Sequence, residues 1–497
     1  MKKRNKIKTM GPVVEIILII AFVSILSFLL NLFNVKGYIT EAGTFETTLV
    51  IVNNILSFDG IKHILNNTLT NFQSLEPVVL MILSLIAVSI LEASGLLKHI
   101  FLPLKNVKMK YVTMLVFFIG IVSTIIGDYS YALLIPIAGI MYKYLDKNPG
   151  LGIITMFVAI SIGYGTGVIY NYQAYQLGNI TEASAVSITS NYNYELLSNI
   201  FFLLVSTVVL TIVGSVVMSN FAKKYSRYEE EDNLNISKKA GRITLLTFII
   251  MCLCIIYCLI PGLPKSGFLL DKQQPTYIGK LFGDASLLSQ GFMVLIIGTL
   301  MLCGFIYGKV SKNIKNLKDY GKGLTKSFEN TGYLFVLLFF VSILYEIIDW
   351  TNITTVISTN IIDFMGSSQI SGLMLVVVAF ITMVFITILI PGTMEKWNLI
   401  APIYIPLLMR ANISPAFTQT LFLVADSIGK LLSPIFVYLL ITVSFISKYD
   451  TDGSVGIFKV MKKIFPSVLI LIVTWVIIIL GWYLIGLPIG IDSTITL

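Results

Sequence analysis

The sequence has few charged residues, two histidines and four cysteines, and each scarcity excludes a class of protein. Of its 497 residues, 12% are charged and 56% are hydrophobic. That balance excludes a water-soluble chain of this length and predicts a protein that crosses a lipid bilayer many times. The net charge of +9 does not indicate a nucleic-acid partner, because the basic residues gather in loops between apolar stretches, as cytoplasmic loops do.

The scarce reactive residues argue against catalysis. His63 and His99 lie near the ends of apolar stretches, so no histidine-based catalytic or zinc site is expected. The cysteines, at positions 252, 254, 258 and 303, all lie inside apolar stretches, which favours core packing over a disulfide or metal framework. The sequence has neither an H-E-x-x-H motif nor a G-x-x-x-x-G-K-[ST] motif. We therefore expect no cofactor, no certain metal site and no enzyme, and an ATP-driven pump would need a partner chain.

Nine apolar segments are long enough to cross a bilayer, which needs about 20 residues. They cover residues 12–33, 77–98, 150–177, 197–219, 243–261, 288–308, 329–349, 415–445 and 467–487. The first follows the basic run MKKRNKIK and lacks an A-x-A cleavage site, so we expect a span rather than a cleaved signal peptide. The positive-inside rule then predicts a multi-pass protein of the inner (cytoplasmic) membrane with a cytoplasmic N-terminus.

Two further apolar segments, 111–145 and 371–410, are interrupted midway by polar residues. Each arm is short for a crossing, and irregular backbone at membrane depth is tolerated only inside protein or beside water. We therefore predict two re-entrant helical hairpins that open to opposite sides of the membrane. The run GYGTG at 163–167 similarly predicts an unwound stretch within the third span.

A repeat relates the two halves of the chain. Segments 136–163 and 402–429 match at eight of 28 positions without a gap, including two prolines and the run V-A-x-S-I-G. A duplicated hydrophobic half with broken helices is typical of secondary transporters. We predict an all-α polytopic fold in four parts: an N-terminal segment and first span (1–33), a first inverted repeat (34–242), linking spans with a cytoplasmic loop (243–327), and a second inverted repeat (328–497).

Charged residues at membrane depth are costly and usually functional. Asp426 is the clearest candidate, because its repeat partner is Ile160 and the fold therefore does not require a carboxylate there. Lys430 follows four residues later on the same face of the predicted helix. The pair is either a static salt bridge or a switch, in which Lys430 releases Asp426 to a proton, a sodium ion or an anionic substrate.

The hairpin tips place hydroxyl groups beside broken helix ends, where helix N-termini attract carboxylates and freed carbonyls attract cations. Ser123, Thr124, Asp128 and Thr393 form one candidate sodium site, and the alternative for Asp128 is to cap the following helix. Trp397 either stacks on an aromatic substrate or lies at the membrane interface.

Two prolines bracket the predicted Asp426 helix, and two charged residues lie at the second tip. Pro415 is expected to begin the Asp426 helix, and Pro434, interior to that segment, to kink it. Glu395 and Lys396 are expected to be solvated.

Residues 391–436 read PGTMEKWNLIAPIYIPLLMRANISPAFTQTLFLVADSIGKLLSPIF, and residues 123–136 read STIIGDYSYALLIP. Both resemble the AbgT-type p-aminobenzoyl-glutamate transporter family, and the likeness runs through most of the chain. The resemblance implies an elevator-type homodimer, each protomer with nine spans and two hairpins. It also implies import of p-aminobenzoyl-glutamate, or export of sulfonamide antimetabolites driven by the ion-motive force. It carries the family's functional tryptophan, two prolines and binding-site aspartate onto Trp397, Pro415, Pro434 and Asp426.

The chain departs from the family pattern at three places. Leu423 stands where the family has an arginine, and we hypothesise that Lys430 takes over its cationic role. Gln173 stands near a family aspartate and cannot ionise. The serine-containing tip before the family tryptophan is Thr-Met-Glu-Lys here, at 393–396.

The sequence therefore predicts a secondary transporter of an anionic or amphipathic organic solute, coupled to protons or sodium. The two hairpins with the third and eighth spans would form the moving core, and the other spans the scaffold and dimer surface. The main alternative is a sodium-coupled carboxylate carrier of related fold; a channel and an intramembrane enzyme are more remote. The candidate binding or coupling residues are Asp426, Lys430, Trp397, Gln173, Asp128, Ser123, Thr124, Thr393, Ser427, Gly163, Gly429, Pro415 and Pro434.

Overall fold

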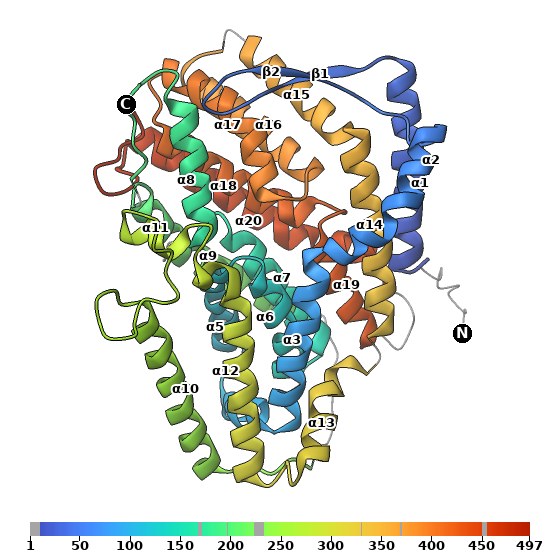
Figure 1. Ribbon diagram of the computed structural model, residues 1–497, viewed down its shortest axis with the longest axis vertical. Helices are drawn as coiled ribbons and strands as arrows, with labels where there is room; N and C mark the ends of the chain where they lie inside the picture. The colour runs from blue at the N-terminus through green and yellow to red at the C-terminus, as the bar shows by residue number, and fades with distance from the viewer. Residues whose placement is uncertain are drawn as a thin grey trace.

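The computed structural model describes residues 10–166, 171–195, 197–222, 233–329, 331–367, 370–449 and 455–497, and within them the chain is mostly helical (Figure 1). The first half contains α1 (Pro12–Leu32), β1 (Lys36–Thr40), β2 (Thr47–Ile51), α2 (Phe58–Ser74), α3 (Glu76–Ala93), α4 (Leu96–Phe101), η1 (Leu102–Asn106), α5 (Met109–Val122), η2 (Ser123–Ile126), α6 (Tyr129–Tyr144), α7 (Pro149–Gly163), α8 (Tyr172–Ala185) and α9 (Ile200–Ala222). The second half contains α10 (Lys238–Leu259), α11 (Tyr277–Phe282), α12 (Leu287–Ser311), α13 (Leu317–Thr325), η3 (Lys326–Phe328), α14 (Gly332–Thr351), α15 (Ile353–Ser367), α16 (Gly372–Leu389), α17 (Thr393–Arg410), α18 (Pro415–Leu432), α19 (Val437–Lys448) and α20 (Ile457–Ile485).

Ten helical segments among the described residues are long and apolar enough to cross a membrane, one more than the nine predicted spans. Two of the ten, Met109–Ile126 and Gly372–Leu389, are the first arms of the predicted hairpins. The third predicted span contributes only a shorter apolar helix, Pro149–Gly163. The all-α polytopic membrane fold is thus confirmed, while the re-entrant course of the hairpins and their opposite orientation stay predictions.

The repeat found in the sequence recurs in the helix boundaries. Pro149 begins α7 and Pro415 begins α18, after Asn148 and Ser414, whose side chains accept hydrogen bonds from the first turns. The breaks recur as well: 123–128 separates α5 from α6, and 390–392 separates α16 from α17. The same order of four helices, separated by three breaks, therefore occurs twice: as α5–α6–α7–α8 and as α16–α17–α18–α19.

The two series pack against each other at the centre of the molecule. The first helix of each rests on the third, since α5 packs on α7 and α16 packs on α18. Across the repeats, α7 contacts both α18 and α19, while α8 contacts both α17 and α18. This reciprocal packing is what an approximate two-fold relation between the series would produce. Figure 1 shows β1 and β2 across one end of the molecule, with α10, α12 and α13 reaching the other.

Several segments differ from the sequence predictions. Regular elements also form between the predicted spans: residues 34–75 contain an antiparallel β-hairpin and the helix α2, and residues 350–370 contain the helix α15. The predicted eighth span is not one kinked helix but two, α18 and α19, separated by residues 433–436. Pro434 accounts for this break, because it disfavours helical backbone at Ser433, whose φ and ψ are −78° and 117°.

The third span is interrupted as predicted, between α7 and α8, although Gly167 of the GYGTG run lies outside the described residues. Residues 1–9, on which the prediction of a cytoplasmic N-terminus depends, also lie outside them.

Candidate functional site

Two lysines hold one buried aspartate where the broken helices of the second repeat meet. Asp426 on α18 is fully buried, and its Oδ1 accepts a hydrogen bond from Lys396 Nζ at 2.6 Å. Its Oδ2 is ion-paired with Lys430, one helical turn further along α18. Thr393 connects these groups: its Oγ1 donates to Asp426 Oδ2 at 2.8 Å and lies 2.5 Å from Lys430 Nζ. A buried ion pair persists only with good geometry and further hydrogen bonds, and this site has both.

The prediction that Lys396 is solvated is wrong. Lys396 is 1% exposed and belongs to the inward face of α17, together with Thr393, Trp397 and Ile400. The spacing of these four residues is the i, i+3, i+4, i+7 pattern of one helix face, so the sequence did carry the signal. Glu395, on the other face, is exposed as predicted.

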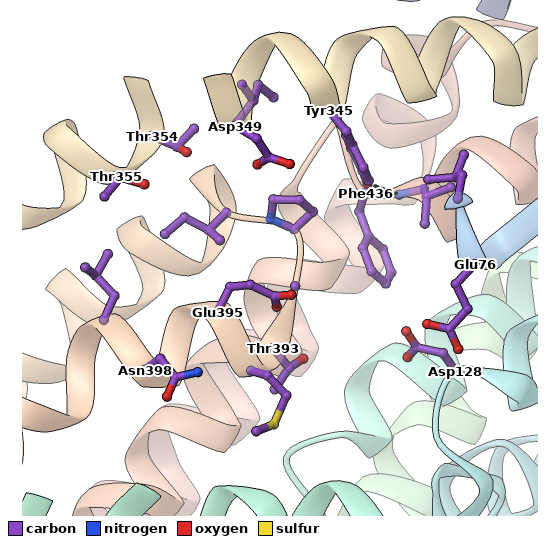
Figure 2. Close-up of a pocket in the computed structure, with 18 of the residues that line it drawn as sticks. Glu76, Asp128, Tyr345, Asp349, Thr354, Thr355, Thr393, Glu395, Asn398 and Phe436 are labelled. Atoms are coloured by element: carbon purple, nitrogen blue, oxygen red, sulfur yellow. Dashed lines mark hydrogen bonds between the residues drawn. The ribbon is translucent and has the colours of Figure 1, made fainter. Parts of the chain in front are cut away.

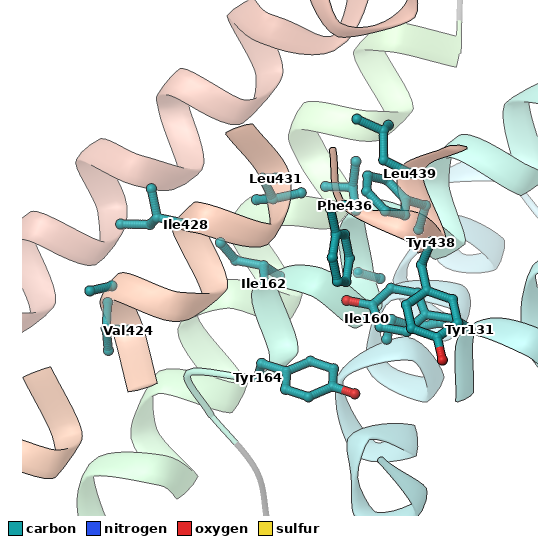
Figure 3. Close-up of a cluster of buried hydrophobic side chains, with 14 of the residues drawn as sticks. Tyr131, Ile160, Ile162, Tyr164, Val424, Ile428, Leu431, Phe436, Tyr438 and Leu439 are labelled. Carbon is teal, nitrogen blue, oxygen red and sulfur yellow. The ribbon is translucent and has the colours of Figure 1, made fainter. Parts of the chain in front are cut away.

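The ring of Tyr164 lies against Lys430 and belongs to a group of stacked tyrosines. Its Nζ lies 4.1 Å from the centroid of the Tyr164 ring, within cation–π range. The Tyr164 hydroxyl donates a hydrogen bond to Asp128 Oδ1. Tyr131 stacks on Tyr164 and on Tyr438, with ring centroids 5.8 and 4.5 Å apart (Figure 3). Tyr164, directly after α7, therefore connects Lys430 of α18 to the stacked tyrosines of α6 and α19.

A cavity of about 970 Å³ opens beside the ion pair. Of the predicted site residues, Asp128, Gln173, Thr393 and Lys430 line it. Figure 2 shows side chains from distant parts of the chain around this space, with Thr393 and Glu395 facing Glu76 and Asp128. The volume lies in the range of pockets that hold small organic ligands.

The wall of this cavity is strongly acidic. One lining residue is a lysine, Lys430, whereas six lining residues carry carboxylates: Glu41, Glu76, Asp128, Glu346, Asp349 and Glu395. Glu346 is ion-paired with His63 of α2. A solute in the cavity would thus meet a single positive contact among several negative ones.

The other predicted site residues do not line this cavity. Trp397 is fully buried, stacks on Phe422, and donates its indole N–H to Thr181 Oγ1 at 3.1 Å. The hydroxyls of Ser123, Thr124 and Ser427 each donate to the backbone carbonyl three residues earlier. In this conformation Trp397 fastens α17 to α8, and its contact with a substrate stays a prediction.

Asp128 does not cap the following helix, so that alternative is wrong. It occupies the N-cap position of α6, but its side chain makes no capping hydrogen bond and instead accepts from Tyr164. The neighbouring Thr124 carbonyl accepts from Asn171 Nδ2 at 2.8 Å and from the Gly127 N–H. Because that carbonyl is already engaged, the predicted sodium site at the first tip would require it to exchange partners.

Gly163 and Gly429 allow close helix approaches at equivalent places in the two repeats. A Cβ atom at Gly163 would lie 2.8 Å from the Ile121 Cα, at the end of α5. One at Gly429 would lie 2.8 Å from the Thr387 backbone carbon, at the end of α16. Both glycines thus bring the helix that carries the site against the arm before a hairpin tip.

Comparison with known proteins places the chain among transporters. Residues 5–497 match the family described as "AbgT putative transporter family". The p-aminobenzoyl-glutamate transport protein of Escherichia coli (strain K12) is 24% identical over 458 residues, which cover 90% of this chain and 87% of the relative.

Two solved structures share the fold. The YdaH transporter of Alcanivorax borkumensis has a TM-score of 0.51 and 22% identity, covering 97% of this chain and 100% of that one. MtrF of Neisseria gonorrhoeae, whose structure illuminates a class of antimetabolite efflux pumps, has a TM-score of 0.50 and 23% identity, covering 98% and 97%. This chain belongs to the AbgT family of multi-pass membrane transporters.

Proposed function

We propose that this transporter is a secondary carrier of an anionic or amphipathic organic solute, with Lys430 as the cation that the solute contacts. The observation that carries the proposal is the position of Lys430, which lines a cavity of about 970 Å³ and is paired with the fully buried Asp426. Lys430 stands one turn beyond Asp426, whereas Leu423, three residues before it, offers no charge.

The solute class follows from the relatives. One relative is a p-aminobenzoyl-glutamate transport protein, and MtrF belongs to a class of antimetabolite efflux pumps. We therefore propose p-aminobenzoyl-glutamate-like folate catabolites, or sulfonamide-type antimetabolites, as the solutes. Both combine an aromatic ring with an acidic group, which suits a cavity that is lined by Lys430 and by the aromatic residues Phe436 and Tyr438.

An elevator movement is the proposed mechanism. The helices α5–α8 and α16–α19 pack closely on one another and, together with the breaks between them, include the predicted site residues. On their cavity side they meet α14, where the Tyr345 hydroxyl donates to the Ile435 carbonyl at 2.9 Å and accepts from the Val437 N–H. The first set would move as the transport core and α14 would belong to the scaffold, with a homodimer formed through scaffold surfaces.

The acidic wall supports coupling to a cation, either a proton or sodium. Carboxylates such as Glu76, Asp128 and Glu395 attract cations and can release protons. The same wall suits a bound sodium ion, which the second candidate function, a sodium-coupled carboxylate carrier of related fold, also requires. Uptake that requires sodium and is inhibited by simple dicarboxylates would select this second candidate.

Equilibrium binding of labelled p-aminobenzoyl-glutamate to the purified full-length chain tests the proposal. Lys430→Met should weaken binding at least about tenfold, since it removes a charge-assisted contact. The matched control is Lys322→Met, which removes an exposed lysine of α13 and should leave the affinity unchanged. Equal affinity in parent and Lys430→Met would reject Lys430 as the solute contact.

A further inference from the structure

The buried site has two lysines for one carboxylate, and the two lysines lie in different surroundings. Lys396 comes from α17, is 1% exposed, and is not among the residues that line the cavity. Lys430 comes from α18 and lines the cavity beside the Tyr164 ring. Each lysine bonds a different carboxylate oxygen of Asp426. One lysine can therefore leave without disturbing the bond of the other.

We propose that Lys396 is the permanent counter-ion of Asp426, and that its presence frees Lys430 to leave Asp426 and bind the anionic group of the solute. Lys396 is then a positioning residue, which acts through Asp426, while Lys430 is the cation that exchanges partners. This inference rests on the proposed function, because it takes the solute to be anionic.

Two lysines are needed because the buried Asp426 carboxylate is costly to leave without a cationic partner. A buried carboxylate that loses its only cationic partner is strongly destabilised, because the interior replaces neither water nor the lost charge. When Lys430 departs, Asp426 keeps the 2.6 Å bond from Lys396 and the 2.8 Å bond from Thr393. Without Lys396, departure of Lys430 would leave Asp426 with the Thr393 hydroxyl as its only remaining partner of the three. Lys430 would then stay paired with Asp426 and could not bind the solute.

The charges of the three ion-paired residues support the same division of roles. Lys396, Lys430 and Asp426 together carry two positive charges and one negative charge. A solute carboxylate that replaces Asp426 as the partner of Lys430 leaves each lysine paired with a carboxylate of its own.

A matched pair of double variants tests the proposal by equilibrium binding of labelled p-aminobenzoyl-glutamate to the purified full-length chain. Lys396→Met/Asp426→Asn and Lys430→Met/Asp426→Asn both retain one lysine and no aspartate, so their buried charge is equal. The first should bind within about threefold of the parent, because Lys430 no longer has a carboxylate to hold it. The second should bind at least about tenfold more weakly than the first.

The single variants complete the test. Lys396→Met alone should bind at least about tenfold more weakly than the parent, and adding Asp426→Asn should restore binding. Lys396→Arg, which keeps the charge, should stay close to the parent. A purely structural role for Lys396 would not be rescued by removing a second buried partner.

Three results would overturn the inference. They are parent-like binding in Lys396→Met, no rescue by the added Asp426→Asn, and equal binding in the two double variants. Should Lys396→Met fail to fold, the two double variants still decide the question by themselves. If the parent chain itself does not bind p-aminobenzoyl-glutamate, the proposed solute is rejected and the inference with it, whereas parent binding with any of the three results rejects the inference alone.

Discussion

Gly429 allows α18, the helix that carries Asp426, to lie close to α16. Gly429 stands three residues after Asp426 and faces Thr387, whose hydroxyl donates to the Ala425 carbonyl at 3.0 Å. A side chain at position 429 would press on the Thr387 backbone and widen the gap between α16 and α18. Since Asp426 is carried by α18, such a shift would also move it relative to Lys396 on α17.

We therefore predict that Gly429→Ala destabilises the protein and weakens solute binding. Overpacking of a close contact costs about 1–3 kcal/mol, so thermal unfolding of the purified protein should begin at a lower temperature. The matched control is Gly298→Ala on α12, where no atom lies within 4 Å of the added carbon. This control should be neutral or stabilising by up to about 1 kcal/mol, because alanine favours the helix. Equal unfolding temperatures for the two variants would contradict the account.

The charged site was predictable only where its partners are close in sequence. The spacing of Asp426 and Lys430 places them on one helix face, and the structure joins them. Lys396 lies 30 residues away, so its pairing depends on how α17 packs against α18. The sequence nonetheless indicates its inward position, because Lys396 shares a helix face with Thr393 and Trp397 by its spacing. The expectation was wrong for Lys396 because it treated Lys396 like its exposed neighbour Glu395, which lies on the other face of α17.

At the scale of elements, the interruptions were predictable because proline, glycine and polar clusters act locally. The breaks at 123–128 and 390–392 contain such residues, and Pro434 ends α18. The sequence did not predict the helices α2 and α15, because both lie between the apolar segments that mark the spans. α2 is amphipathic, and its apolar residues Phe58, Leu65 and Leu69 are more than 70% exposed. The helix therefore lacks the continuous apolar stretch by which the spans were predicted.

The inverted arrangement of the repeats predicts opposite accessibility for equivalent positions. Asn106 precedes α5 and Ser371 precedes α16, and both residues are exposed. In a variant without the four native cysteines, Asn106→Cys should react with a membrane-impermeant maleimide from the cytoplasmic side. Ser371→Cys should react from the outer side, because the second hairpin is predicted to open there.

The labelling is done on intact cells and on inside-out vesicles, and the cysteine-free chain is the control for background reaction. Labelling of both positions from the same side would contradict the inverted topology, whatever the outcome of the transport experiments.

At the scale of the whole molecule, the cavity could not be deduced from the sequence. Its wall combines residues of the β-hairpin, α3, α14, α15 and α17, which come together only through tertiary packing. The acidic character of that wall, with Glu41 and Glu346 far apart in the chain, was for the same reason not foreseen. What the repeat did predict was that broken helices from both halves would meet at one site, and Asp128 and Thr393 line the same cavity.

The central claim is that this chain is an ion-coupled carrier whose transport depends on Asp426. The most direct test is uptake of labelled p-aminobenzoyl-glutamate into proteoliposomes under an imposed proton gradient or sodium gradient, with the parent chain and Asp426→Asn side by side. We expect saturable uptake by the parent chain that requires one of the two gradients and is lost in Asp426→Asn. Uptake that does not depend on either gradient, or that persists unchanged in Asp426→Asn, would contradict the claim.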